Sequence, residues 1–148
     1  MSAVRVREAD FAADHAAIRA IRFAVFVHEQ RVPADLEMDE RDAECVHILA
    51  FVDGEPVGTG RIDIEKDGKI GRVAVLAAAR RHGVGRAVME HLHEIARRGG
   101  LSHVWCHAQV AAVPFYERLG YRVVGEVFDE AGIGHVRMER PIDRVPAP

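Results

Sequence analysis

The spacing of apolar residues changes several times along the chain, and each change predicts a new element. Residues 4–7 alternate between apolar and basic, which predicts a short strand. Apolar residues return every three or four positions over 11–27 and 84–98, which predicts two amphipathic helices, and a shorter helix is expected over 112–119. Apolar runs bounded by turn residues predict further strands over 45–52, 57–64, 69–75, 103–107, 121–128 and 135–139.

This order of elements predicts an α+β fold with a mixed, mostly antiparallel sheet of six to seven strands flanked by helices. Turn residues between the strands of 45–75 predict an antiparallel meander. The strand at 103–107 follows a strand–helix crossover, so we expect it to lie parallel to the strand at 69–75. Residues 31–44 are rich in acidic side chains and predict a long loop, a feature that is often functional.

Composition adds limits to this picture. The length of 148 residues fits one domain over 1–148, with a flexible tail over 141–148 that contains several prolines. A formal net charge of −3 indicates no general affinity for nucleic acid. The N-terminus has no apolar run typical of a signal peptide, and no stretch approaches the roughly 20 apolar residues that span a membrane. We therefore expect a cytoplasmic protein with neither nucleic acid nor membrane as a partner.

No metal site is predicted from the cysteines and histidines. Cys45 and Cys106 lack the spacing of zinc ligands and do not form a disulfide framework. His91 and His93 are two residues apart on a predicted helix, so they point to different faces and cannot easily share an ion.

The glycine-rich, basic turn over 80–86 is the first candidate for chemistry. It joins the strand at 69–75 to the first turn of the helix at 84–98, where backbone N–H groups are unpaired and the helix dipole is positive. Glycines let the backbone approach a ligand closely. Together these features predict an anion site, most often one for phosphate.

Two of three common phosphate-binding designs fit this turn poorly. A Walker loop needs Gly-Lys-Ser or Gly-Lys-Thr, but Arg86-Ala87 follows Gly85. A dinucleotide fold needs a third glycine and an acidic residue about 20 positions later, and both are missing. The third design is Arg/Gln-x-x-Gly-x-Gly/Ala between a strand and a helix. Arg80, Gly83 and Gly85 fit it without a mismatch.

A second segment adds a family resemblance. Residues 109–121 resemble the Asn-x-x-Ala-x-x-x-Tyr-x-x-x-Gly-Phe segment of the GNAT acetyltransferase superfamily, with Gln109 in place of Asn and Tyr121 in place of Phe. The glycine turn is similar to that superfamily's motif as well, and the resemblance covers nearly the whole chain. The segments 28–30, 37–42 and 132–138 further resemble the small ElaA-like branch, whose natural acceptor is poorly defined.

The resemblance implies that acetyl-coenzyme A (acetyl-CoA) is the donor. The strands at 69–75 and 103–107 would splay apart to hold the pantetheine arm, and the Val75 N–H would polarise the thioester carbonyl. Tyr116 stands where the family places a tyrosine that acts as an acid toward the departing thiolate. The residues implied to bind the cofactor are Val73, Ala74, Val75, Arg80, Arg81, His82, Gly83, Val84, Gly85, Arg86, Gln109, Ala112, Phe115 and Tyr116.

The general base and the acceptor site stay open at this level. Glu29, His107 and His135 are the candidate catalytic groups besides Tyr116, because each is expected near the acceptor side of the fold. Glu29, Glu37, Asp39 and His47 are the candidate acceptor-binding residues, since an acidic rim would attract a cationic amine.

The expected activity is N-acetyl transfer from acetyl-CoA to a primary amine of a small molecule or peptide. A non-catalytic acyl-CoA-binding sensor is the alternative. A homodimer is compatible with the sequence but is not required by it.

Overall fold

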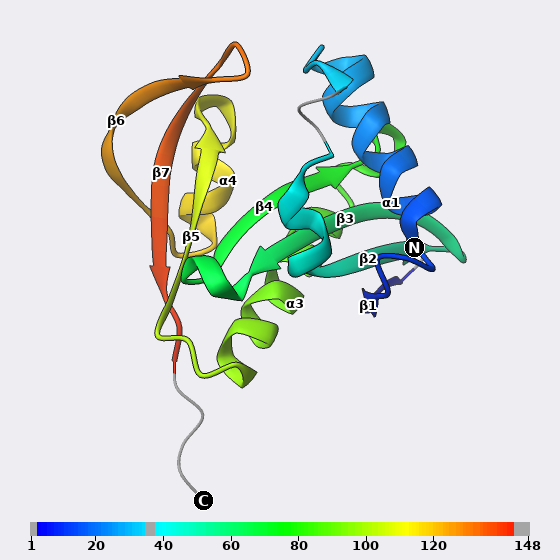
Figure 1. The fold of residues 1–148 in the computed structure, drawn as a ribbon, viewed down its shortest axis with the longest axis horizontal. Helices are drawn as coiled ribbons and strands as arrows, with labels where there is room; N and C mark the ends of the chain where they lie inside the picture. Colours follow the sequence, from blue (N-terminus) through cyan, green and yellow to red (C-terminus); the bar gives the residue numbers. More distant parts are fainter. Residues whose placement is uncertain (1–2, 35–37, 144–148) are drawn as a thin grey trace, which may run out of the picture.

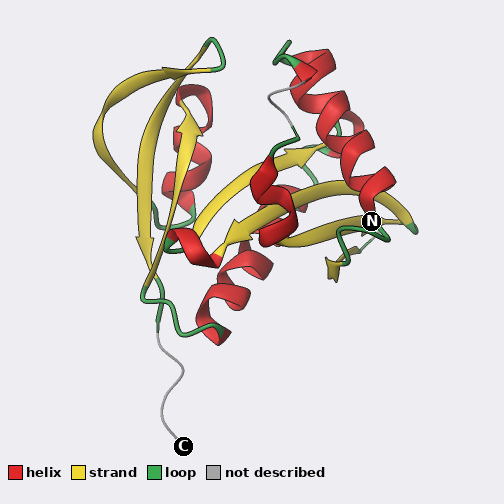
Figure 2. Cartoon of the chain, viewed as in Figure 1, coloured by secondary structure: helices red, strands yellow, loops and turns green. Residues whose placement is uncertain are grey.

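The computed structural model describes residues 3–34 and 38–143, and its centre is one seven-stranded sheet (Figures 1 and 2). The strand order is β1-β2-β3-β4-β5-β7-β6. β4 and β5 are parallel, and the other neighbouring strands are antiparallel. The predicted α+β fold with a mixed, mostly antiparallel sheet is therefore confirmed. The strands are β1 (Val4–Ala9), β2 (Val46–Val52), β3 (Glu55–Asp63), β4 (Lys69–Val75), β5 (His103–Gln109), β6 (Arg122–Glu130) and β7 (Ile133–Pro141).

Helices cover both faces of the sheet because the strands place alternate side chains on opposite faces. In β2, Leu49 packs with α1 (His15–Arg22). Its neighbours Ile48 and Ala50 pack instead in a larger core with α3 (Val84–Arg98). The short helix α4 (Val113–Arg118) packs against that same core. Among the helices of the described ranges, none is long and apolar enough to cross a membrane.

The sheet opens between β4 and β5. These strands pair only at Lys69 with Trp105 and at Ile70 with Cys106, and beyond that point they diverge (Figure 1). A β-bulge lies where the divergence begins, because Arg72 and Val73 together oppose one residue of β3. Arg72 has a φ of +51° there. The predicted separation of the two strands is confirmed, and one edge of β4 is left without a neighbouring strand.

Several predicted boundaries need correction. The helix expected over 11–27 is α1 followed by a π-helix, η1 (Phe23–Glu29). The loop expected over 31–44 contains a 3-10 helix, η2 (Glu40–Glu44). The Asp39 carboxylate accepts a hydrogen bond from the Arg41 N–H, and the Asp42 carboxylate accepts one from the Asp39 N–H. This reciprocal capping stabilises a short helix within a segment that composition alone assigns to a loop.

The C-terminal hairpin is tighter than predicted. The strands expected over 121–128 and 135–139 are longer toward each other, because β6 continues to Glu130 and β7 starts at Ile133. Ala131 and Gly132, with φ of +53° and +79°, make the turn between them. β7 ends at Pro141, and Ile142 is buried, with its N–H bonded to the Ser102 carbonyl. The chain therefore packs on the sheet past the predicted start of the tail, and residues 144–148 lie outside the described ranges.

Candidate active site

A cleft of about 810 Å³ occupies the opening between β4 and β5. It extends from the N-terminus of α3 and from α4 to the turn between β6 and β7, and η1 forms another wall. The cleft brings together nearly all of the residues implied to bind the cofactor, and His82 is the one among them that does not line it. Three candidate catalytic residues, Glu29, His107 and His135, line the same cleft with Tyr116.

The turn before α3 has the geometry of an anion site. Gly83 is the N-cap residue of α3 with φ of +78°, and Arg81 has φ of +68°. No side chain caps this helix, so the N–H groups of its first turn are left to a ligand or to water. A Cβ at Gly83 would meet no atom within 4 Å, whereas a Cβ at Gly85 would come within 3.3 Å of Phe115. The backbone is thus open toward the cleft, and the geometry fits a phosphate group.

The free edge of β4 supplies further backbone groups. The Leu76 N–H donates to the Val57 carbonyl of β3 at 2.8 Å. Because N–H groups alternate sides along an extended chain, the Val75 N–H points to the other edge, toward the cleft. The Val75 carbonyl on that edge accepts a hydrogen bond from Arg80 Nε at 3.0 Å. Val73 and Val75 both line the cleft, so this edge can pair with an extended ligand.

The Tyr116 hydroxyl is available for a ligand. Within the part of the chain that the structure describes, this hydroxyl makes no hydrogen bond. It is not among the buried polar atoms that lack a partner, so it is accessible from the cleft. The neighbouring Tyr121 hydroxyl lies 2.6 Å from His93 Nε2, so that tyrosine is already paired. Burial raises the pKa of Tyr116 well above its ordinary value. Its phenol therefore stays protonated at neutral pH and can donate a hydrogen bond.

Glu130 lies between two histidines on the other side of the cleft. Its Oε1 is 3.2 Å from His107 Nδ1, and its Oε2 is 3.6 Å from His135 Nε2. His135 Nδ1 is 2.7 Å from the Ile133 carbonyl oxygen, which can only accept a hydrogen bond. His135 Nδ1 therefore carries a proton and donates it, so Nε2 is the atom that can take up another. Glu130 stabilises the positive charge that this creates.

Two polar contacts cross the cleft between residues that line it. Arg80 Nη2 donates to Glu29 Oε1 at 2.6 Å, which pairs a predicted cofactor-binding residue with a predicted catalytic one. Gln109 Nε2 donates to Gln30 Oε1 at 2.7 Å. Both contacts join η1 or its end to the cofactor side of the cleft. The Glu29 carboxylate thus pairs with Arg80, whereas His107 and His135 contact Glu130.

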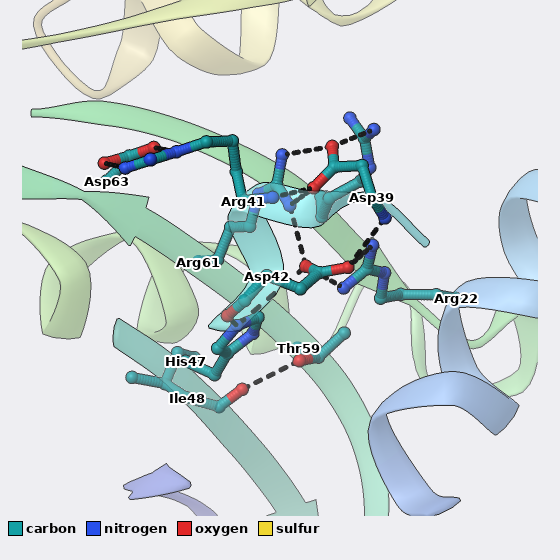
Figure 3. Close-up of polar contacts among 10 residues, drawn as sticks. Arg22, Asp39, Arg41, Asp42, His47, Ile48, Thr59, Arg61 and Asp63 are labelled. Carbon is teal, nitrogen blue, oxygen red and sulfur yellow. Dashed lines mark hydrogen bonds and ion pairs between the residues drawn. The ribbon is translucent and has the colours of Figure 1, made fainter. Parts of the chain in front are cut away.

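Asp39 and Asp42, near the end of the segment 31–44, face arginines (Figure 3), and neither of them lines the cleft. Asp42 Oδ1 contacts Arg22 Nη1 at 2.8 Å and Arg61 Nη1 at 2.7 Å, and all three side chains are largely buried. Asp39 binds Arg61 at 2.7 Å and Arg72 at 3.0 Å. Burial by itself would raise the pKa of Asp39, but the hydrogen bonds and charge of Arg61 outweigh it and bring the pKa to about 2.

His47 belongs to the same interior cluster. Its Nε2 lies 2.7 Å from the Asp42 carbonyl oxygen (Figure 3). Its ring stacks on Phe11 at 4.5 Å between centroids. Burial lowers the pKa of His47, which favours a neutral ring. Neither Asp39 nor His47 lines the cleft, so the structure does not bring them to the expected acceptor site. Glu37, the remaining candidate, lies outside the described residues.

The described part of the chain contains no group of three or more His, Cys, Asp or Glu side chains positioned to hold a metal ion.

Comparison with known proteins decides the family. The model of the acetyltransferase (GNAT) domain matches residues 9–141. The chain belongs to the GNAT acetyltransferase family. Its relatives include the Bacillus subtilis protein named "Uncharacterized N-acetyltransferase YjcF", which is 44% identical over 120 residues that cover 80% of this chain and 86% of YjcF. Escherichia coli ElaA is 34% identical over 132 residues, covering 85% of this chain and 86% of ElaA.

Solved structures agree with this assignment. The crystal structure of E. coli ElaA superposes with a TM-score of 0.83 at 30% identity and covers 93% of this chain and 99% of ElaA. An acyl-CoA N-acyltransferase from Pseudomonas aeruginosa superposes with a TM-score of 0.80 at 30% identity, over 95% of this chain and 99% of that protein. This acetyltransferase is thus a member of the ElaA-like branch, as its motifs predicted, and it is an acyltransferase enzyme.

Sequence reasoning missed several residues of the cleft. Glu130 lies outside the predicted strands over 121–128 and 135–139 and had no predicted role, although its partners His107 and His135 were both candidates. Gln30, Lys69 and Arg72 also line the cleft and had no predicted role in the site. The register of β4 with β5 and of β6 with β7 brings Lys69 and Glu130 into place. A pattern confined to one segment does not contain this information.

Proposed function

We propose that this acetyltransferase transfers the acetyl group of acetyl-CoA directly to a primary amine of a small molecule or peptide. The observation that supports this most is that an open anion site and a histidine–carboxylate cluster line one cleft. Acetyl-CoA, when bound, supplies an activated thioester and a thiolate leaving group. The remaining steps belong to side chains and backbone groups of the chain itself.

The donor is held by the backbone on the cofactor side. The amides from Arg81 to Arg86 receive the pyrophosphate, for which the left-handed Gly83 and the uncapped start of α3 leave room. The free edge of β4 pairs with the amides of the pantetheine arm. The Val75 N–H on that edge then donates to the carbonyl oxygen under attack, where negative charge develops.

The proton transfers are made by side chains on the acceptor side of the cleft and by Tyr116. An alkylammonium has a pKa near 10.4, so the acceptor must lose a proton before it attacks. His107 and His135 are the proton acceptors, directly or through a water molecule, and Glu130 orients them and balances the charge that they gain. The protonated Tyr116 hydroxyl donates to the leaving sulfur.

The test is a thiol-release assay with acetyl-CoA and a panel of amino acids, amino sugars, polyamines and peptides. We expect release that depends on the amine, together with an acetylated product of matching mass. Binding of acetyl-CoA without transfer to any amine would support the sensor alternative instead. A cytoplasmic location and a homodimer stay predictions, to be checked by fractionation and by the mass of the protein in solution.

A further inference from the structure

Lys69 differs from the neighbouring arginines Arg72 and Arg137 in having no carboxylate partner among the residues that the structure describes. It is one of two lysines in the chain, and it lines the cleft at the start of β4. Arg72 binds Asp39 and Arg137 binds Glu139, but no carboxylate of residues 3–34 and 38–143 lies within ion-pair distance of Lys69. Its ammonium group lies 5.3 Å from the centroid of the Trp105 ring, which offers a weaker partner.

This environment has an energetic consequence. Burial lowers the pKa of Lys69, because the ammonium loses water without gaining a carboxylate in exchange. The charge of Glu130 acts in the opposite direction, but that carboxylate is already in contact with His107 and His135. An anion placed beside Lys69 would replace the lost water and be bound strongly.

Lys69 is close to the groups assigned to proton transfer. Lys69 pairs with Trp105 in the parallel ladder, and the Trp105 and His107 rings are 5.4 Å apart between centroids. Both rings project from the same face of β5, since the two residues are two positions apart. The distances from the Trp105 centroid to Lys69 Nζ and to the His107 centroid therefore set an upper limit on the distance between Lys69 Nζ and the His107 ring. A short molecule with an amine at one end and an anion at the other can span it.

The charges of the cleft argue against a purely cationic acceptor. Asp39 and Asp42 are neutralised by Arg22, Arg61 and Arg72, so they do not form the acidic rim that the sequence suggested. A polyamine entering the cleft would meet the Lys69 ammonium, and the cleft carboxylates Glu29 and Glu130 already contact Arg80 and the two histidines. An acceptor that carries an anionic group would cancel that charge.

We propose that Lys69 binds an anionic group of the acceptor, so that the acceptor is a primary amine that also carries a carboxylate or a phosphate. This inference rests on the proposed N-acetyltransferase function and narrows its substrate class. Amino acids and aminoalkyl phosphates have this chemistry. Lys69 is a specificity residue that anchors the end of the acceptor away from the reacting amine.

The experiment compares matched acceptors on matched variants. An amino acid is paired with its carboxamide, and phosphoethanolamine with ethanolamine, so that each pair differs in the anion. The enzymes are the wild type, Lys69→Met, Lys69→Arg and Lys66→Met. Lys66 is the other lysine and is exposed, so its variant controls for the loss of one positive charge.

We expect the wild type and Lys66→Met to prefer the anionic member of at least one pair by about 10- to 100-fold in kcat/KM, the range for a hydrogen bond to a charged group. Lys69→Met should lose this preference through a higher KM for the anionic acceptor, while the KM for acetyl-CoA is kept. Lys69→Arg should retain part of it. The pair that responds identifies carboxylate or phosphate as the anion.

Transfer without any preference for the anionic acceptors, or a preference that survives in Lys69→Met, would overturn the inference. Binding of the same acceptors to the protein saturated with coenzyme A provides a second readout. If no amine is acetylated but the anionic ones bind tenfold more weakly to Lys69→Met, the proposed function fails while the anion site stands. Equal binding to both proteins would refute the anion site.

Discussion

The two halves of the cleft are constructed differently. The half proposed to bind the cofactor, called the cofactor half, comes mainly from one continuous stretch, β4 through the first turn of α3, with α4 added from the segment that follows β5. The acceptor half combines Lys69, His107, Glu130 and His135, each from a different strand. A binding site made of neighbouring residues carries its geometry within the local backbone. A site made of separate strands depends on their register, so a change in pairing would dismantle it.

Gly83→Val tests the local half and should have the largest effect. A valine at φ of +78° is strained, and its side chain would enter the open space in front of the helix, so acetyl-CoA affinity should fall by more than about 100-fold. Gly54→Val is the matched control. Gly54 also has a φ of +78° and open space around a Cβ, but it lies in the turn between β2 and β3.

Both variants should lose similar stability in thermal unfolding, and only Gly83→Val should lose acetyl-CoA binding in calorimetric titration. Equal binding by the two variants would mean that the anion site is not at this turn.

Asp42→Asn tests whether the acidic segment belongs to the scaffold or to the acceptor half. It leaves Arg22 and Arg61 without their shared carboxylate in the interior, so the free energy of unfolding should fall by about 3–5 kcal/mol. Urea unfolding measures this loss. Asp67→Asn, at an exposed turn position with φ of +57° that asparagine also accepts, should change stability little.

Below the unfolding transition, Asp42→Asn should keep the wild-type KM for the acceptor. An increase in the KM for the acceptor without a loss of stability would indicate that the segment 31–44 belongs to the acceptor site after all.

The sequence indicated the glycine turn of the proposed cofactor half more directly than it indicated the residues of the proposed acceptor half, for a physical reason. Gly83 and Gly85 lie between a strand and a helix that were both evident from periodicity, and the residues that follow them fit two other phosphate-binding designs poorly. The antiparallel meander over 45–75 and the parallel pairing of 69–75 with 103–107 followed from turn residues and from a crossover. Charge along the segment 31–44, in contrast, gave no indication that Asp39 and Asp42 would face arginines from α1, β3 and β4.

Glu130 shows the same limit within the site. Its neighbours Ala131 and Gly132 indicate a turn, and nothing local shows that the turn is only those two residues long. The pairing of Glu130 with Ile133 keeps it in β6, and the pairing of Gln109 with His135 joins β7 to β5. These long-range pairings bring the carboxylate to His107 and His135, which the sequence could name only as separate candidates.

Tyr116→Phe tests the link between the two halves, since in the proposed reaction the thiolate leaves where they meet. Without the hydroxyl, kcat should fall by about 100-fold, because the sulfur loses its hydrogen-bond donor, whereas acetyl-CoA affinity should change little. Tyr121→Phe is the control on a neighbouring ring, 5.4 Å away between centroids. It breaks the contact with His93 and should lower stability by about 1 kcal/mol while keeping kcat.

Steady-state kinetics with thiol detection measures both tyrosine variants. Unchanged turnover in Tyr116→Phe would remove this tyrosine from the acid role.

Glu130→Gln should have the smallest effect on turnover and tests the half that depends on register. Glutamine keeps the size of the side chain but removes the charge that balances a protonated histidine, so kcat should fall by about tenfold, as for the loss of one hydrogen bond to a charged group. Glu126→Gln removes one negative charge from an exposed position of the same strand and should leave kcat unchanged.

His107→Gln and His135→Gln, each combined with Glu130→Gln, then identify the histidine on which the Glu130 carboxylate acts. The double variant that loses no more activity than its histidine single variant marks that partner, because Glu130 has nothing left to orient once the ring is gone. Fully additive losses with both histidines would show that Glu130 acts without either ring, and the acceptor half would then need a different proton acceptor.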